Sequence, residues 1–439
     1  MKKHLLSLLD KIAVAFLYLN VLVPTVAPGG IPLSKAAFVG MLAVFVAILT
    51  AGDERLRLRS LSYIILSLGG MALLVGTSLL LGNELESILG LSSIVLFVLI
   101  IPPLTLLFAH FGAQRYIRHL TQAIICLALI FVTLVVLTGS FNLREIATYV
   151  ELSETTFSDT LRFAFFPGGV RITTTNQGFF SVGLVLAYAR VLKSGRWRDI
   201  LAFALVGIAL HFCYTMSLWV SAVLGLTACI LLPRPQSLHS PDRHASLGAH
   251  PLRMNRTDWR KLVTILAGVA AISFTLLKLP AFIIESKGES FNFKHLQLLE
   301  ALDTFSSSPL VGKGLGFVYH QGEYQFVSGS ASTLLENSYA VILSSTGLLG
   351  AAVFAFIYLY YPVFLLRSSK SWWMLVLLIA HLMVLVQAWG NPFLWSGGIG
   401  LLFACFLGAS LEHAASQRTR AHQFVVTTAR SVPTVPPFS

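Results

Sequence analysis

Apolar segments long enough to cross a membrane recur along the whole chain of 439 residues, separated by short polar stretches. An α-helix needs about 20 apolar residues to span a bilayer, whereas a transmembrane β-barrel shows short segments of alternating hydrophobicity. The pattern therefore predicts an all-α polytopic integral membrane protein. We expect about twelve spans, near residues 12–28, 35–52, 60–82, 88–110, 119–139, 176–193, 199–214, 216–233, 262–280, 335–366, 371–390 and 394–411.

The composition strengthens this prediction. Hydrophobic residues make up 56% of the chain and charged residues only 11%, whereas a soluble domain carries about 25% charged residues. A net charge of +12 would suggest nucleic acid as the partner of a soluble protein. Here the basic residues lie mostly in short loops between apolar segments, which is a topology signal, so we expect a membrane and no nucleic acid.

The distribution of charge predicts the orientation of the chain, because loops rich in Lys and Arg lie in the cytoplasm. With both termini cytoplasmic, only eight of the 31 Lys and Arg residues fall on the other face, together with twelve of the 19 Asp and Glu residues. The eight are Lys35, Arg144, Arg162, Arg171, Lys278, Lys287, Lys294 and Lys313. That face, expected to be periplasmic, carries two large loops, at about 140–175 and 281–334.

The spans and loops divide the chain into segments with different expected roles. These are five N-terminal transmembrane helices (1–139), a periplasmic loop (140–175), transmembrane helices six to eight (176–233), a basic cytoplasmic loop (234–261), helix nine (262–280), a large periplasmic loop with short helices (281–334), helices ten to twelve (335–411) and a disordered cytoplasmic tail (412–439). The candidate chemistry is concentrated in the two periplasmic loops and at the start of the tenth span.

The first periplasmic loop places an arginine beside a sharp turn. The first half of the loop has the pattern of a short amphipathic helix on the membrane surface. Pro167-Gly168-Gly169 then predicts a turn, and Arg171 follows two residues after it. An arginine held at the membrane surface is suited to binding a lipid-linked phosphate. The alternative is that its side chain extends to the lipid headgroups.

The second periplasmic loop is predicted to contain a helix and then a glycine-rich turn. The helix KHLQLLEALDTF has apolar residues at helical spacing, at Leu296, Leu299, Leu302 and Phe305, and places Lys294, Gln297 and Ala301 on another face. The turn SPLVGKGLG is not a P-loop, because no Ser or Thr follows Lys313. Its glycines are also explained by a backbone that folds back toward the membrane. His295 and His320 are single histidines, which are more typical of a solvated loop than of a catalyst.

The tenth span opens with the polar sequence Glu336-Asn337-Ser338. One explanation is structural, because Ser332 or Thr333 can cap the helix and a carboxylate in the first turn interacts well with the helix dipole. A carboxylate and an amide at the mouth of a span are also suited to chemistry on a substrate. The residues alone leave both explanations open.

In their order and spacing, these features resemble the superfamily of O-antigen ligases and O-antigen or exopolysaccharide polymerases. Members carry a PLxGxGxG turn before a segment of the type HNxxLxxLxxxGllG, which here correspond to Pro309–Gly316 and to Asn337 through Gly347 and Gly350. The resemblance covers roughly residues 160–365 in motifs and the whole chain in topology. It implies a GT-C-like fold in the bacterial inner membrane. It also implies transfer of a glycan from undecaprenyl pyrophosphate to an acceptor hydroxyl at the periplasmic face, without metal or cofactor.

The resemblance assigns residues to the pyrophosphate. Arg171 matches the family's arginine ahead of a "PN" span, with Asn176 beginning the span here, and Lys294 falls where the family has an arginine in the large loop. Exchange of arginine for lysine loses the bidentate fork but keeps a charge. The family's "SRG" after the seventh span has no counterpart here, so Arg162 or Lys313 is expected to supply a further cation.

The resemblance also suggests how the acceptor is activated. Glu336 falls where ligases carry a histidine and is the expected general base, with Asn337 orienting a sugar hydroxyl. Weaker candidate contacts to the glycan are His295, Gln297, His320 and Asn176. Displacement from one face predicts inversion at the anomeric carbon.

Glutamate at position 336 favours a polymerase, which joins repeat units, over a ligase, which attaches finished glycan to lipid A-core or to a protein. A chain-length regulator and a flippase would then be partner proteins. A membrane transporter is the alternative of another class. A transporter predicts ionisable residues deep in several spans or paired broken helices, and the spans contain few deep charges.

Overall fold

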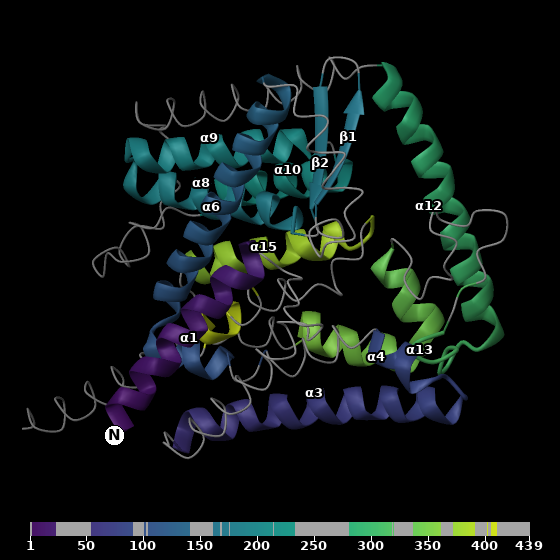
Figure 1. Ribbon diagram of the computed structural model, residues 1–439. Helices are drawn as coiled ribbons and strands as arrows, with labels where there is room; N and C mark the ends of the chain where they lie inside the picture. The colour runs from purple at the N-terminus through teal and green to yellow at the C-terminus, as the bar shows by residue number, and fades with distance from the viewer. Residues whose placement is uncertain are drawn as a thin grey trace, which may run out of the picture.

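The structure, a computed structural model, consists of α-helices and one small β-hairpin (Figure 1). It describes residues 2–22, 54–90, 101, 104–140, 161–166, 169–174, 176–213, 215–232, 281–317, 319, 337–360, 372–390, 402 and 405–410. Where a predicted span falls within these residues, the chain is helical apart from a few residues at its ends. The spans expected at 35–52 and 262–280, the loop 234–261 and the tail 412–439 lie outside the described residues.

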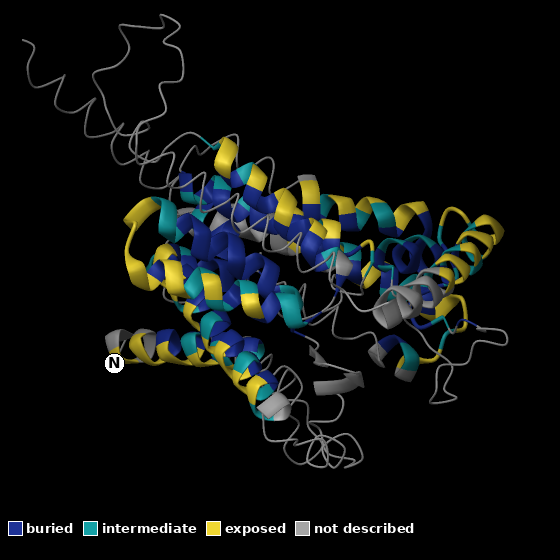
Figure 2. Ribbon diagram, turned by 90° about the horizontal axis from the view of Figure 1, so that it is seen from above, coloured by how far each residue is buried: buried dark blue, intermediate teal, exposed yellow. Residues whose placement is uncertain are grey.

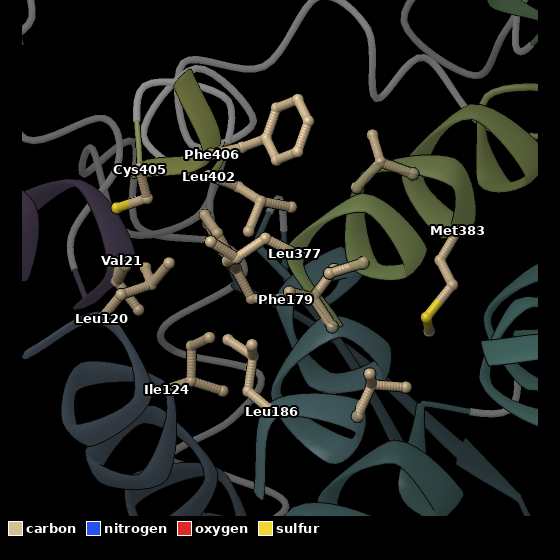
Figure 3. Packing of buried hydrophobic residues seen from close by; sticks show 14 of the residues in the cluster. Val21, Leu120, Ile124, Phe179, Leu186, Leu377, Met383, Leu402, Cys405 and Phe406 are labelled. Carbon is tan, nitrogen blue, oxygen red and sulfur yellow. The ribbon is translucent and has the colours of Figure 1, made fainter. Parts of the chain in front are cut away.

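One group of helices packs into a bundle, with buried apolar side chains between them. Its members are α1 (Lys2–Leu22), α6 (Ala113–Ser140), α8 (Gly178–Ser194), α9 (Trp197–Phe212), α10 (Met216–Leu231) and α15 (Trp372–Gln387). Side chains from α1, α6, α8 and α15 meet in its core (Figure 3), among them Val21, Leu120, Ile124, Phe179, Leu186, Leu377 and Met383.

A second group of helices contains the segments around the expected large loop. Its members are α3 (Glu54–Leu80), α4 (Leu85–Gly90), α12 (Ala281–Ser307) and α13 (Ser338–Ala355), which continues into a π-helical turn, Phe356–Tyr360. Short helices were expected in loop 281–334, but α12 is one continuous helix of 27 residues. No proline interrupts it, and it runs along one edge of the molecule, across the direction of α8, α9 and α10 (Figure 1).

Two of the described helices, Ala113–Leu137 and Ser338–Leu359, are long and apolar enough to cross a membrane. Helices of the bundle also have exposed residues along their lengths (Figure 2). Some of these residues are large and apolar, such as Leu129 and Ile130 on α6 and Leu224 on α10. Outward-facing apolar surface of this kind suits contact with lipid. Both observations favour a helical membrane protein, and the number of spans and their orientation stay predictions.

The hairpin is the departure from an all-α fold. Strands β1 (Leu161–Phe166) and β2 (Gly169–Thr174) pair antiparallel, with Phe166 opposite Gly169, so two residues connect them. The strands are rich in aromatic and β-branched residues, which favour extended backbone, and Pro-Gly is a turn sequence. The amphipathic helix expected in the first half of this loop falls on residues 141–160, outside the described residues.

Helix α13 is broken at Gly347, a feature that the sequence did not predict. Gly347 has φ 61° and ψ −161°, a backbone region open essentially only to glycine. The break leaves carbonyl and N–H groups without partners in the helix, and the turn after α12 satisfies them. Its bonds are Lys313 N to Ser344 O (3.0 Å), Gly314 N to Ser345 O (2.7 Å), Leu348 N to Pro309 O (2.9 Å) and Leu349 N to Leu310 O (3.0 Å).

The same glycine-rich turn is also anchored to the end of α3. Asn83 Nδ2 donates to the Lys313 carbonyl at 2.7 Å, and the Leu315 N–H donates to Ser78 Oγ at 2.6 Å. The amides that could cradle a phosphate are therefore used inside the protein. This pairing supports the structural explanation of the glycines, in which the backbone folds back onto its neighbours.

A buried phenol closes the space beside the break. Tyr319 Oη lies 2.5 Å from Ser344 Oγ, and Ser344 itself donates to the carbonyl of Ala340, so the phenol is the donor of this pair. Burial raises the pKa of Tyr319 to about 12. The phenol therefore stays protonated at neutral pH and holds the turn against α13.

Candidate functional site

The start of α13 is capped by Asn337. Its Oδ1 accepts the N–H groups of Tyr339 at 3.0 Å and Ala340 at 3.1 Å, which satisfies two of the amides that a helix start leaves unpaired. The expectation that Ser332 or Thr333 caps this helix was wrong, because α13 begins at Ser338. Glu336 lies outside the described residues, one residue before the cap.

The start of α13 meets the C-terminal end of α15. A helix end leaves its last carbonyls without partners in the helix, and here groups from other helices take them. The Ser338 N–H donates to Ala388 O at 3.0 Å, and Tyr339 Oη donates to Leu385 O at 2.6 Å. We call the meeting point of Lys294, Ser338, Ala388 and Gly390 the junction.

Lys294 brings a positive charge from α12 to this junction. Its Nζ donates to the carbonyl of Gly390 at 2.9 Å, across 96 residues of sequence. A cation beside the carbonyl end of a helix is favoured by the helix dipole, and the half-buried position limits the freedom of the side chain. The large-loop helix and the polar helix start, which lie far apart in the sequence, thus meet at one helix end.

A buried polar network that was not predicted from the sequence fixes the end of α15. Gln387 donates through Nε2 to Ser221 Oγ at 3.0 Å and to Ser181 Oγ, and all three residues are buried. The three helices α8, α10 and α15 are therefore tied together next to the junction. In the sequence, the signal for this network was a lone glutamine near the end of an apolar span, because a buried side-chain amide needs hydrogen-bond partners.

The hairpin places two of the predicted pyrophosphate ligands on one face. In its register Arg162 is opposite Thr173 and Arg171 is opposite Ala164. Opposed residues share a face and strand residues alternate between faces. Positions 162 and 171 are therefore diagonal neighbours on the same face, about 7–8 Å apart. The other face carries mostly apolar residues, namely Leu161, Phe163, Phe165, Val170 and Ile172.

The remaining predicted site residues have varied surroundings. Asn176 is buried and donates to the carbonyls of Asn20 and Val21, at 2.7 Å each, so it joins α8 to the end of α1. On α12, Gln297 is buried and His295 is exposed. Lys313 contributes its backbone to the glycine-rich turn and donates its N–H to Ser344 O. By helical rise, Ser344 lies about 9 Å along α13 from Ser338. His320 lies outside the described residues.

Neither the models of known protein families nor the curated proteins contain a match for this chain. Within the described part of the chain, no three His, Cys, Asp or Glu side chains form a group that could share a metal ion. The site itself offers a fixed ammonium group and a capped helix start, which contact the same helix end through Gly390 and Ala388.

The cap makes a testable prediction about Asn337. Asn337→Ala should lower the free energy of unfolding by about 1 kcal/mol, because two N–H groups lose their acceptor. Asn337→Ser, which also caps well, should restore both the stability and the activity. Thermal unfolding in detergent, paired with an activity assay, measures this. Restored stability without restored activity would instead give the amide a direct role in the reaction.

Proposed function

We propose that this protein is a polysaccharide polymerase of the membrane. It transfers a glycan from undecaprenyl pyrophosphate to a sugar hydroxyl at the periplasmic face of the bacterial inner membrane, with inversion at the anomeric carbon. The observation that carries the proposal is the junction. There the cation of α12 and the start of α13 are held within hydrogen-bond distance of the same helix end, through Gly390 and Ala388.

The cations suit the leaving group of this reaction. When the sugar–oxygen bond breaks, negative charge develops on the pyrophosphate, and fixed positive groups that stabilise it lower the barrier. Lys294 is such a group, because its position is set by Gly390. Positions 162 and 171 share a face of the hairpin, and two arginines suit the several oxygens of a diphosphate.

The acceptor hydroxyl must lose its proton as it attacks the sugar. Glu336 directly precedes the cap residue Asn337 in the sequence, and it is the base that we propose. A carboxylate within hydrogen-bond reach of the hydroxyl can accept that proton. The reaction then needs a base and a charged leaving-group site, and it uses no nucleotide sugar.

A substitution in cells tests the role of Glu336. Glu336→Gln keeps the size and polarity of the side chain but removes its ability to act as a base, so single-repeat lipid-linked glycan should accumulate and long polymer should fall by about a hundredfold. Gel separation of extracted lipid-linked glycans measures both products. Glu300→Gln on α12 is the matched control and should leave the polymer unchanged.

Full-length polymer at a normal yield in the Glu336→Gln strain would eliminate the proposed base. A different change in the products would favour the ligase, which also transfers a glycan from the lipid carrier. Long glycan stranded on the carrier lipid, with polymer formation intact, is the result expected of a ligase defect and would contradict a polymerase.

A further inference from the structure

A large aromatic side chain is exposed at the junction. Trp389 is 65% exposed, although burial of an indole is strongly favourable. Its neighbours in sequence are both held, since Ala388 O accepts from Ser338 N and Gly390 O accepts from Lys294 Nζ. The backbone on either side of this indole is therefore fixed by the two elements that form the junction.

The ring itself has an aromatic neighbour. The centroid of the Tyr339 ring lies 6.3 Å from that of Trp389, with the planes tilted by 45°, and the Tyr339 phenol is tied to Leu385 O. Pairs of this geometry are attractive and restrict the motion of the rings. Trp389 is thus an exposed and positioned aromatic surface.

From this placement we infer that Trp389 stacks against a sugar ring of the glycan substrate. The inference depends on the proposed function and adds a substrate contact to it. The sugar that is transferred has to lie close to the cation that holds its leaving group, for which the proposed function names Lys294. Trp389 lies between Gly390, which holds Lys294, and Ala388, which holds the start of α13.

The chemistry of a sugar ring suits an indole. A pyranose presents patches of C–H groups on its faces, and these carry a small positive charge. The face of an aromatic ring is negative, so the two surfaces attract each other and both leave water. The hydroxyl groups at the ring edge remain able to hydrogen-bond to polar neighbours of the junction.

Contact with lipid is the competing explanation for this side chain. Leu382 and Val386 on α15 precede Trp389 at helical spacing, and both are exposed. Tryptophan at the end of such a segment is also typical of a membrane interface. A sugar reaches this indole from the aqueous solution, whereas an acyl chain reaches it from the membrane. The two explanations therefore differ in which of these changes the fluorescence emission of the indole.

Purified protein in nanodiscs separates them, with glycan released by mild acid from the host's own lipid carrier as the probe. Trp389→Ala should weaken binding of this glycan roughly tenfold, and Trp389→Phe by less, since a ring is retained. Trp197→Ala is the matched control, because Trp197 is also 65% exposed but lies at the start of α9, and its affinity should be unchanged. Isothermal titration gives the affinities.

Unchanged affinity in Trp389→Ala would overturn the stacking. So would a Trp389 emission that brominated acyl chains quench and the glycan leaves unaltered, which would make this side chain a lipid anchor. The proposed function is tested separately by wild-type transfer from a lipid-linked donor. If transfer occurs and Trp389→Ala binds the glycan normally, only the stacking is wrong; if the wild type transfers nothing, the proposed function is wrong.

Discussion

Lys294→Gln should lower the rate of the proposed glycan transfer by about a hundredfold or more, because it removes the positive charge that we propose stabilises the leaving group. The glutamine amide is also a hydrogen-bond donor, although its side chain is one bond shorter, so the contact between α12 and the end of α15 should be weakened less than by an apolar residue. The loss should therefore appear in the turnover number while thermal stability changes little. Initial rates with a lipid-linked donor, measured beside a melting curve, test this directly.

Two further variants make the Lys294 result specific. Lys294→Arg keeps a charge and a donor and should retain most of the activity. Lys193→Gln is the control, because Lys193 lies at the C-terminal end of α8, where its Nζ is 5.6 Å from the centroid of the Trp373 ring. A normal turnover number in Lys294→Gln would show that the ammonium group has only a structural role.

Gly347→Ala should have the largest effect on stability, a loss of more than about 4 kcal/mol or failure to fold. A Cβ at this position would lie 2.5 Å from both the carbonyl carbon and the carbonyl oxygen of Leu310 and 2.6 Å from the N–H nitrogen of Gly312. These are backbone atoms, so no side-chain rotation relieves the overlap. The φ of 61° with ψ of −161° adds strain for any residue with a Cβ.

Gly195→Ala is the matched control for this prediction. Gly195 has almost the same φ, 62°, but ends α8 with a ψ of 11°, and a Cβ there would meet nothing within 4 Å. Its substitution should cost only about 1–2 kcal/mol, the ordinary price of a left-handed residue. Size-exclusion profiles and melting curves in detergent compare the two. Equal losses would mean that the break in α13 is not closed by the turn after α12.

The apolar segments predicted most of the helical structure because their length and hydrophobicity are local properties of the chain. The hairpin also had a local signal, since Pro167-Gly168 separates two short runs rich in aromatic and β-branched residues. That signal was missed because the surrounding residues favoured an amphipathic helix at the membrane surface. Helix α12 was expected only in its second half, where the leucine spacing is regular, and it extends to Ala281.

The junction could not be predicted from the sequence. Its bonds join residues far apart in the chain and end on main-chain carbonyls, which every residue has. Nothing in the sequence marks Ala388 or Gly390 as an acceptor. The break at Gly347 has the same origin, because a glycine inside an apolar helix is common and only the packed turn shows why this one is needed.

The resemblance to polymerases and ligases supports one part of the proposed function. The packing of the chain supports another part. The resemblance named Lys294, Glu336 and Asn337 as candidates, and the fold brings Lys294 and the start of α13 to one helix end. The fold also gives Asn337 a structural role that the resemblance did not suggest, as the cap of α13. A residue can occupy a motif position and still act mainly through the backbone that it holds.

The most direct measurement uses purified wild-type protein in nanodiscs with a single repeat unit linked to undecaprenyl pyrophosphate. The products are followed by mass spectrometry without nucleotide sugar. The protein should convert the donor to carrier-linked glycans of two or more repeat units, each new linkage inverted, with release of undecaprenyl pyrophosphate. Donor recovered unchanged from folded protein would contradict the proposed glycan transfer.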